Sequence, residues 1–432
     1  MSDGLDADAI MGRELEALVG ELYPICRSIT GDGLRQTLRI LQRQVPLEIV
    51  EVPSGTPVLD WVVPREWNIR DAWIKDPSGN KVVDFRASNL HVVNYSSPVS
   101  GRFELAALRP HLHTLPAQPD AIPYRTTYYE EAWGFCLTQR QLDALPDGEY
   151  EVCIDSTLAP GSLSYGELLV PGESDEEILI SAHACHPSLC DDNLSGIAVS
   201  LLLARELRSR PPGRQGVRFL FAPGTIGAIT WLAQNQDSLR VAHGLTLTCL
   251  GDHHPFTFKK TFQGRSDVDR AASLVLQKSG YPHELIDFFP YGYDERQYNS
   301  PGFRLPVASL MRGRHGRFPE YHTSLDNPDF VSGERMVESY RVLRDIIECL
   351  QGNGRYMNLA PHAEPQLGKR GLYRAVGGTE LPDLQYALLW VLNMSDGQHS
   401  LLAIAERAGL PFKSVQVAAR LLLEHELLAE VS

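Results

Sequence analysis

The chain has 432 residues, of which 43% are hydrophobic and 22% are charged, as is usual for a folded protein with roughly three domains. Its 40 basic and 54 acidic residues leave a formal net charge of −14, so binding to the phosphates of nucleic acid is not expected. No apolar run approaches the ~20 residues that cross a bilayer, and the first nine residues carry three Asp and no basic residue. We therefore expect a cytoplasmic protein with no nucleic-acid or membrane partner.

The first third of the chain is predicted to be helical and then β-rich. Apolar residues at helical spacing predict a helix over residues 11–45 that is broken at Gly31-Asp32-Gly33. From residue 47 to about residue 172, short alternating runs are separated by Pro, Gly, Asn and Asp. This texture predicts a β-rich module with many turns.

After residue 172, strands and helices are predicted to alternate. Strands are expected over 177–182, 217–222 and 244–250, and helices over 196–207, 226–234, 268–280 and 336–350. Such alternation predicts an α/β layer, in which helices sandwich a mostly parallel sheet.

The C-terminal tail has the outline of a winged helix. Helices are expected over 384–391, 400–407 and 414–423, followed by a small hairpin at 427–431. Residues 381–432 carry three basic and six acidic side chains, whereas a DNA-reading module is basic. The tail is therefore predicted to serve packing or oligomerisation, and a homo-oligomer is expected.

The densest group of reactive side chains lies between the strand 177–182 and the helix 196–207. It holds two His, two Cys and two Asp within the ten residues from His183 to Asp192, and a second cluster follows at residues 320–326. Loops at the carboxyl edge of a parallel sheet are where α/β proteins build sites, and His with carboxylate suits zinc. The candidate metal ligands are His183, His186, Asp192 and His322.

Other interpretations of these residues remain open. Asp192 could be the N-cap of the following helix. Cys185 and Cys190 could be thiolate ligands or buried free thiols. Seven cysteines, an odd number spread over a long chain, do not indicate a disulfide framework.

The order of several motifs resembles the zinc aminopeptidases of the M28 type. More closely, the chain resembles a bacterial family of aminopeptidase-like proteins with an inserted β domain and a C-terminal winged helix. The motifs that carry this resemblance are Tyr128 to Cys136, Cys185-His186-Pro187-Ser188, Asp192 to Gly196, Asp294-Glu295-Arg296-Gln297, Ser300 to Phe303, and Glu320 to Ser324.

The resemblance implies roles for the candidate ligands. His183 stands where the M28 pattern has its first ligand, Asp192 where it has the metal-bridging Asp, and His322 where it has its last His. His186 competes with His183, because the spacing from 183 to 186 also matches the His-x-x-Glu pair of zinc carboxypeptidases. Cys185 takes the place of the Asp that supports the first ligand.

The sequence departs from the M28 pattern after the second strand, where that pattern has a general-base Glu followed by a ligand Glu. Gly224 and Thr225 stand at these two positions instead, and Thr248 stands where the M28 pattern has another ligand, an Asp. Because these ligands are missing, one zinc per chain is expected.

Three explanations of Gly224 stay open. Another carboxylate could serve as the base, with Glu295 first, then Asp294 and Glu320. The chain could be a binding-only member, or the glycine could have been introduced to trap a substrate. A tight turn that needs no side chain would also account for it.

A small peptide or an amide-containing metabolite is the expected substrate. Arg296 and Arg312 are candidates to hold its carboxylate, because guanidinium groups make bidentate contacts. Tyr129 and Tyr321 are candidates for the pocket wall.

These observations predict three domains and one leading function. Residues 1–48 and 160–368 are expected to form the aminopeptidase-like zinc hydrolase domain, 49–159 the inserted β-rich domain, and 369–432 the winged helix. The leading function is zinc-dependent hydrolysis of a peptide or amide bond. The alternatives are a catalytically degenerate zinc-binding or scaffold protein and, after it, a winged-helix regulator.

Overall fold

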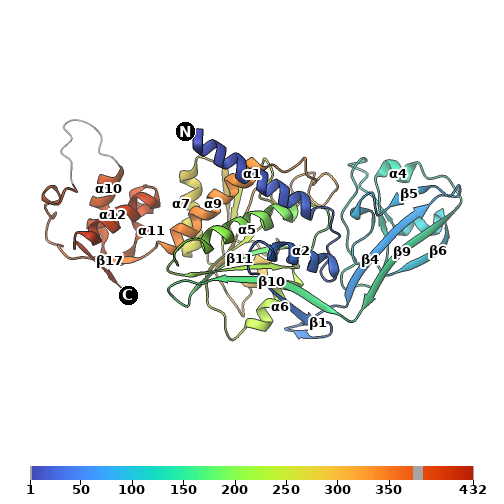
Figure 1. The fold of residues 1–432 in the computed structure, drawn as a ribbon, viewed down its shortest axis with the longest axis horizontal. Helices are drawn as coiled ribbons and strands as arrows, with labels where there is room; N and C mark the ends of the chain where they lie inside the picture. Colours follow the sequence, from blue (N-terminus) through green and yellow to red (C-terminus); the bar gives the residue numbers. More distant parts are fainter. Residues whose placement is uncertain (1, 373–382, 432) are drawn as a thin grey trace.

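The computed structural model of the protein describes residues 2–372 and 383–431. Figure 1 shows three parts in a row: a β-rich module at one end, a central α/β body, and a helical C-terminal module at the other end. Within the described residues, no helix is both long and apolar enough to cross a membrane.

An eight-stranded sheet forms the centre of the α/β body. Its four central strands β12, β11, β13 and β16 run parallel, while β1, β10 and β14 pair antiparallel with their inner neighbours. This confirms the mostly parallel sheet expected from the alternation of elements. In spatial order the strands are β1 (Glu48–Pro53), β10 (Ser162–Val170), β12 (Gly216–Ala222), β11 (Glu177–His183), β13 (Val241–Leu247), β16 (Val307–Met311), β14 (Phe256–Lys259) and β15 (His283–Ile286).

Helices cover both faces of this sheet (Figure 1). One face carries α1 (Ser2–Leu22), α2 (Asp32–Gln42), α5 (Gly196–Arg208), α7 (Asp267–Ser279) and α9 (Gly333–Gln351), and the other carries α6 (Ile226–Asn235) and the short α8 (Glu295–Tyr298). Because successive strand residues point to opposite faces, Ile178 and Ile180 of β11 join the first core while Leu179 joins the second. Burial on both faces explains why the strand is apolar throughout.

The predicted helix over residues 11–45 is wrong in one respect. α1 ends at Leu22, and Pro24, which has no backbone N–H to donate, follows two residues later. Ile25 is buried in the core from a loop, not from a helix. The chain turns into α2 at Gly31, whose φ of 96° and contact with the Trp67 carbonyl leave no room for a side chain.

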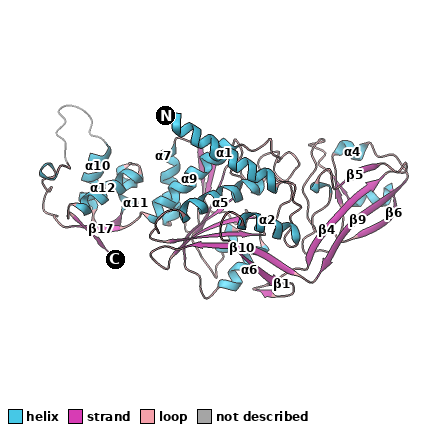
Figure 2. Cartoon of the chain, viewed as in Figure 1, coloured by secondary structure: helices cyan, strands magenta, loops and turns pink. Residues whose placement is uncertain are grey.

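The β-rich module is built on a four-stranded antiparallel sheet in the order β5-β4-β9-β6, drawn in magenta in Figure 2. Its strands are β4 (Glu66–Lys75), β5 (Lys81–Asp84), β6 (Val99–Glu104) and β9 (Glu149–Ala159). Shorter elements lie beside it: β7 (Leu112–His113), β8 (Phe135–Cys136), α3 (Leu105–Leu108), α4 (Gln139–Asp143), η1 (Asn89–His91) and η2 (Arg109–His111). The hairpin of β2 (Pro57–Val58) and β3 (Trp61–Val62) packs instead against α6 of the α/β body.

Glu66 joins this module to the α/β body at the start of β4. Its carboxylate accepts hydrogen bonds from the guanidinium of Arg35 on α2 and from the backbone N–H of Ser162 on β10, the latter at 3.0 Å. The Arg35 hydrogen bond outweighs burial and lowers the pKa of Glu66 from 4.5 to about 2. One charged group therefore ties two strands and a helix together at the junction.

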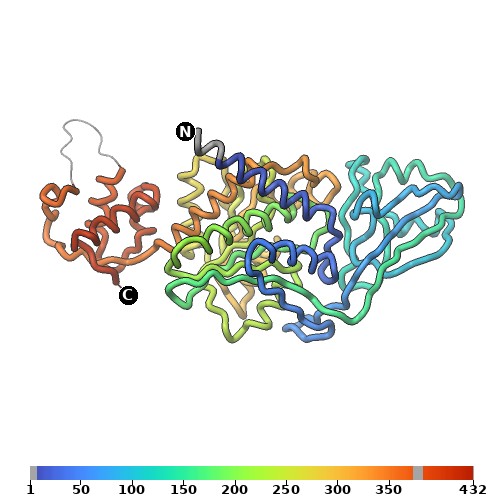
Figure 3. Tube along the Cα trace, viewed as in Figure 1, coloured from blue at the N-terminus to red at the C-terminus, as the bar shows by residue number. Residues whose placement is uncertain are grey.

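The C-terminal module confirms the predicted winged helix. Its helices are α10 (Asp383–Met394), α11 (Leu401–Ala408) and α12 (Phe412–Glu424), its sheet joins β18 (Asp396–Ser400), β17 (Arg355–Asn358) and β19 (Leu428–Val431), and η4 (Gly368–Arg370) precedes α10. Figure 3 shows it next to α7 and α9. Arg270 of α7 forms an ion pair with Glu406 of α11 at 2.6 Å, and Lys278 donates to the Gly409 carbonyl.

Strand pairing places β1 with the main sheet and β17 with the C-terminal sheet. The exact domain boundaries expected after residues 48 and 368 stay predictions.

Candidate metal centre

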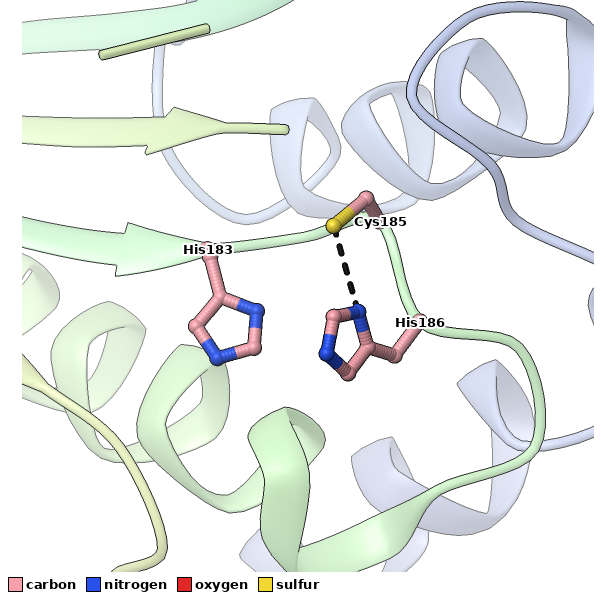
Figure 4. Close-up of side chains that lie close together, drawn as sticks. All are labelled: His183, Cys185 and His186. Carbon is pink, nitrogen blue, oxygen red and sulfur yellow. Dashed lines mark hydrogen bonds between the residues drawn. The ribbon is translucent and has the colours of Figure 1, made fainter. Parts of the chain in front are cut away.

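The histidine-rich segment lies at the carboxyl end of β11. His183 is the last residue of that strand, and a loop leads through Cys185 and His186 to a kinked helical turn, η3 (Cys190–Ser195), from which α5 begins. Figure 4 shows the rings of His183 and His186 side by side, with the sulfur of Cys185 next to them. Their ring centroids are 4.7 Å apart.

Asp192 lies at the centre of the cluster, with three histidine rings around its carboxylate. Its Oδ1 is 2.8 Å from His183 Nε2 and accepts a hydrogen bond from the Thr248 hydroxyl at 3.3 Å. Its Oδ2 is 3.0 Å from His322 Nε2 and 3.6 Å from His186 Nε2. The structure thus brings together all four residues that the sequence nominated as ligands.

The electrostatics of the cluster favour an ionised carboxylate. Burial by itself would raise the pKa of Asp192, which is 1% exposed, but His186, His183 and His322 outweigh burial and hold the pKa well below its ordinary value. Burial lowers the pKa of His186 well below its ordinary value, which favours the neutral imidazole. A carboxylate anion with neutral imidazoles is the protonation state in which these groups bind a metal.

The donor atoms fit a single zinc-like cation. Those of His186, Asp192 and His322 all lie within 4.8 Å of one another, and His183, Cys185 and His186 form a second group at that spacing. His186 Nε2 and His183 Nδ1 are buried with no hydrogen-bond partner. A buried polar atom is normally satisfied, so these lone pairs are suited to a cation. Two imidazoles and one carboxylate match zinc, with room for a further ligand.

Asp326 holds the loop that carries Asp192. One of its carboxylate oxygens accepts the backbone N–H groups of Cys190 and Asp191, and the other accepts that of Asp192. These groups are buried, so the three hydrogen bonds form in a region of low dielectric. The bonds fix the backbone from which the Asp192 side chain extends.

His322 reaches the cluster from a separate loop that pairs with the β-rich module. The His322 carbonyl accepts the N–H of Tyr124 at 2.8 Å, and Ser324 donates to Ile122. The ring of Tyr124 packs against His322 and His186 at centroid distances of 5.2 and 4.9 Å. His322 has a φ of 55°, an uncommon value for a residue with a side chain, and its side chain is 33% exposed. The cluster is therefore most open to solvent on the His322 side.

Aromatic rings line the approach to His322. Tyr321 stacks on His322 with centroids 4.0 Å apart, and the hydroxyls of Tyr124 and Tyr128 lie 2.9 Å from each other. Tyr129, which is 50% exposed, contacts Tyr128 and continues this row toward the surface. The role of Tyr129 and Tyr321 in a pocket wall stays a prediction.

Two of the acidic candidates for a general base, Glu295 and Asp294, are buried. Glu295 is buried in an ion pair with Lys259 Nζ at 2.6 Å, and its second oxygen accepts the N–H of Tyr293. Asp294 is buried as well, and burial raises its pKa well above the ordinary value, which favours the neutral acid. Both carboxylate oxygens of Glu295 therefore have partners, and neither is free to serve the histidine cluster as a base.

Arg312 has a different task from the substrate contact that the sequence suggested. Its guanidinium donates to Ser339, Glu338 and the His254 carbonyl, and it stacks on the ring of Phe256. A buried guanidinium with these partners is not available to a substrate carboxylate. Arg296 lies partly buried on α8.

Three residues of this site were assigned no role from the sequence. Tyr293 lies against His183 with centroids 4.2 Å apart, Tyr124 comes from the β-rich module, and Asp326 acts through backbone groups. The ring contacts depend on tertiary packing between distant segments. Only Asp326 was signalled, by its place in the cluster at residues 320–326.

Two family profiles match the chain. The family described as "Domain of unknown function (DUF4910)" matches residues 16–353, and the one described as "winged helix-turn-helix" matches residues 354–430.

Two proteins of one organism resemble nearly the whole chain, and a third shares its fold over a part. A Clostridium acetobutylicum protein named "Putative polysaccharide biosynthesis protein with aminopeptidase-like domain" is 49% identical over 419 residues, which cover 96% of each chain. The crystal structure of a "putative peptidase" from the same organism has a TM-score of 0.93 at 47% identity and covers 100% of this chain and 99% of that one. A zinc aminopeptidase from Bacillus subtilis has a TM-score of 0.56 at 12% identity, over 78% of this chain and 94% of that chain, so the two share a fold.

Proposed function

Since the chain belongs to the DUF4910 family, whose description leaves its function open, we propose a function from the site: zinc-dependent hydrolysis of a peptide or amide bond. The observation that carries the proposal is the buried group of His186, Asp192 and His322, whose donor atoms lie within 4.8 Å of one another. The aminopeptidase-like fold and the names of the two Clostridium acetobutylicum proteins support it.

In this proposal, His186 Nε2, Asp192 Oδ2 and His322 Nε2 hold the metal. His183 donates to Asp192 Oδ1 and so orients the carboxylate, as outer partners of metal ligands do. Thr248 adds a hydrogen bond to the same oxygen. This set of three ligands leaves a coordination position open, which is typical of catalytic zinc.

The residues around the ligands would bind and orient the substrate. When bound, zinc supplies polarisation of a carbonyl and lowers the pKa of a bound water toward about 7. Tyr321 and Tyr124 pack against the ring of His322 and would orient it beside the open position. Tyr129 extends this wall to the surface, so we propose that it contacts a small peptide or an amide-containing metabolite.

A second candidate function is binding without hydrolysis. The observation that favours it is the absence of a side chain at Gly224 together with the engagement of both Glu295 oxygens by Lys259 and Tyr293. Loss of a positioned carboxylate typically slows such reactions by about 10²–10⁴-fold.

Metal content of the purified protein tests the proposal directly. We expect about one zinc per chain by elemental mass spectrometry, held by the group of His186, Asp192 and His322, and its loss in a D192A/H322A variant. The control is H399A, which removes an exposed histidine of the winged helix. No zinc in the parent after zinc addition, or undiminished zinc in the double variant, would contradict the proposed site. Zinc without turnover of a peptide-amide panel would favour the binding protein.

A further inference from the structure

Position 224 is filled by a neighbouring side chain. A Cβ built on Gly224 would overlap Cε1, Cζ and the hydroxyl oxygen of Tyr293, nearer than non-bonded atoms come. Tyr293 lies in the loop before α8, where its N–H donates to Glu295. The glycine and the tyrosine therefore depend on each other: even an alanine at position 224 would displace this ring.

The hydroxyl of Tyr293 belongs to a chain of hydrogen bonds that ends on a metal-site histidine. It lies 3.5 Å from Cys185 Sγ, and that sulfur lies 3.2 Å from His186 Nδ1. The Cys185 thiol donates to the Gly224 carbonyl at 3.8 Å. With its proton directed there, the sulfur accepts from the Tyr293 hydroxyl and from His186 Nδ1–H.

This arrangement assigns the tautomer of His186. A proton on Nδ1 leaves a lone pair on Nε2, and Nε2 is the buried atom with no hydrogen-bond partner. Metal-binding histidines normally donate their second N–H to a carboxylate, carbonyl or water. Here the sulfur of Cys185, whose own proton is directed to the Gly224 carbonyl, takes that part.

We propose that Tyr293 and Gly224 are a matched pair, in which the Tyr293 ring takes the space of a side chain at position 224 and its hydroxyl, through Cys185, positions His186 for the metal. Tyr293 is a positioning residue in this proposal. The steric half depends only on the packing of Tyr293 against Gly224. The second half rests on the metal site proposed above.

A mutant cycle tests the steric half by thermal unfolding of the full chain. We expect G224A to lower the unfolding midpoint by several degrees when residue 293 is Tyr, and by much less in a Y293A background. The control is G302A, because a Cβ on Gly302 meets no atom within 4 Å. Equal shifts of G224A in the two backgrounds would overturn the steric pairing.

Zinc affinity, measured by competition with a chelator, tests the second half. We expect Y293F to weaken zinc binding by roughly 10-fold, at the lower end for outer partners of metal ligands. The matched control is Y298F, which removes a buried hydroxyl bonded to Ser181, away from Cys185. Equal affinity in Y293F and Y298F would overturn the positioning role. Absence of zinc from the parent would instead overturn the proposed function together with this half, and the steric half would still be decided by the cycle.

Discussion

Asp326 fixes the position of Asp192 through the main chain, because its Oδ2 accepts the Asp192 N–H at 3.0 Å while its Oδ1 accepts the two preceding N–H groups. In an Asn side chain at this position, the amide oxygen would still accept hydrogen bonds on one side. The NH₂ group on the other side would face a backbone N–H, and neither group can accept. We expect D326N to lower the free energy of unfolding by about 2–4 kcal/mol, since a buried N–H would face the new NH₂ without an acceptor. Denaturant unfolding measures the loss, and D329N, an exposed residue of the same loop, is the control. An equal effect of the two variants would contradict the importance of these bonds.

The two histidines at the end of β11 should differ in their effect on zinc. His186 Nε2 faces the Asp192 and His322 donors without a partner, whereas His183 Nε2 bonds to Asp192. We expect H186A to lose bound zinc and H183A to retain it with affinity lower by about 10–100-fold. Chelator competition followed by metal analysis separates these outcomes. Full zinc affinity in H186A would instead indicate that His183 is the ligand and His186 the outer partner.

Hydrolysis should not be restored by an acid at position 224 alone. The new side chain in G224E would overlap the Tyr293 ring. We expect an increase in peptide-amide hydrolysis only in G224E/Y293G, by about 10²–10⁴-fold if the carboxylate acts as general base. Initial rates of the zinc-loaded variants measure this. A comparable gain in G224E alone would show that the tyrosine does not block the position.

The junction at Glu66 should make stability depend on acidic pH. The Arg35 hydrogen bond lowers the folded-state pKa of Glu66 from 4.5 to about 2, so its stabilisation is present above pH 4.5 and is lost as the pH falls toward 2. We expect E66Q to cost on the order of 1–3 kcal/mol at pH 7 and less at pH 3. Denaturant unfolding at both pH values checks this. The control is E131Q, because Glu131 forms a more exposed ion pair with Arg65. A pH-independent cost would refute the linkage.

The winged helix should not bind DNA. Of the two basic side chains on α12, Arg420 lies 3.9 Å from Glu424. Lys413 lines a cavity shared with residues of α7 and α9. We expect no shift of duplex DNA by the purified chain even at low salt, because DNA binding depends on phosphate neutralisation. A salt-sensitive shift that disappears in K413E/R420E would favour the regulator instead.

The sequence pattern was sufficient for the fold because apolar runs and helical repeats are local features. The apolar runs of β11 and β12 and the helical repeat of α5 are visible in short windows, and the motif order gave the ligand candidates. Side-chain partners were not predictable in the same way. Whether Glu295 is free depends on Lys259, 36 positions away, and the same holds for Arg312 with Glu338.

Gly224 shows this limit most clearly. Read alone, the glycine suggests a missing side chain and an empty space, whereas the fold fills that space with Tyr293 from another loop. The sequence shows that position 224 has no side chain, but it does not show which neighbouring side chain fills the space.

The pairing between the His322 loop and residues 122–124 has a consequence for how the molecule can be divided. Two backbone hydrogen bonds, Tyr124 to His322 and Ser324 to Ile122, cross from the β-rich module to the loop of a candidate ligand. The β-rich module therefore supports the loop of a candidate ligand and is not an independent appendage. A chain shortened to the α/β body would lose the support of His322, so excision of the module and loss of metal should occur as one event. Exchange of the module between relatives would likewise carry part of the centre with it.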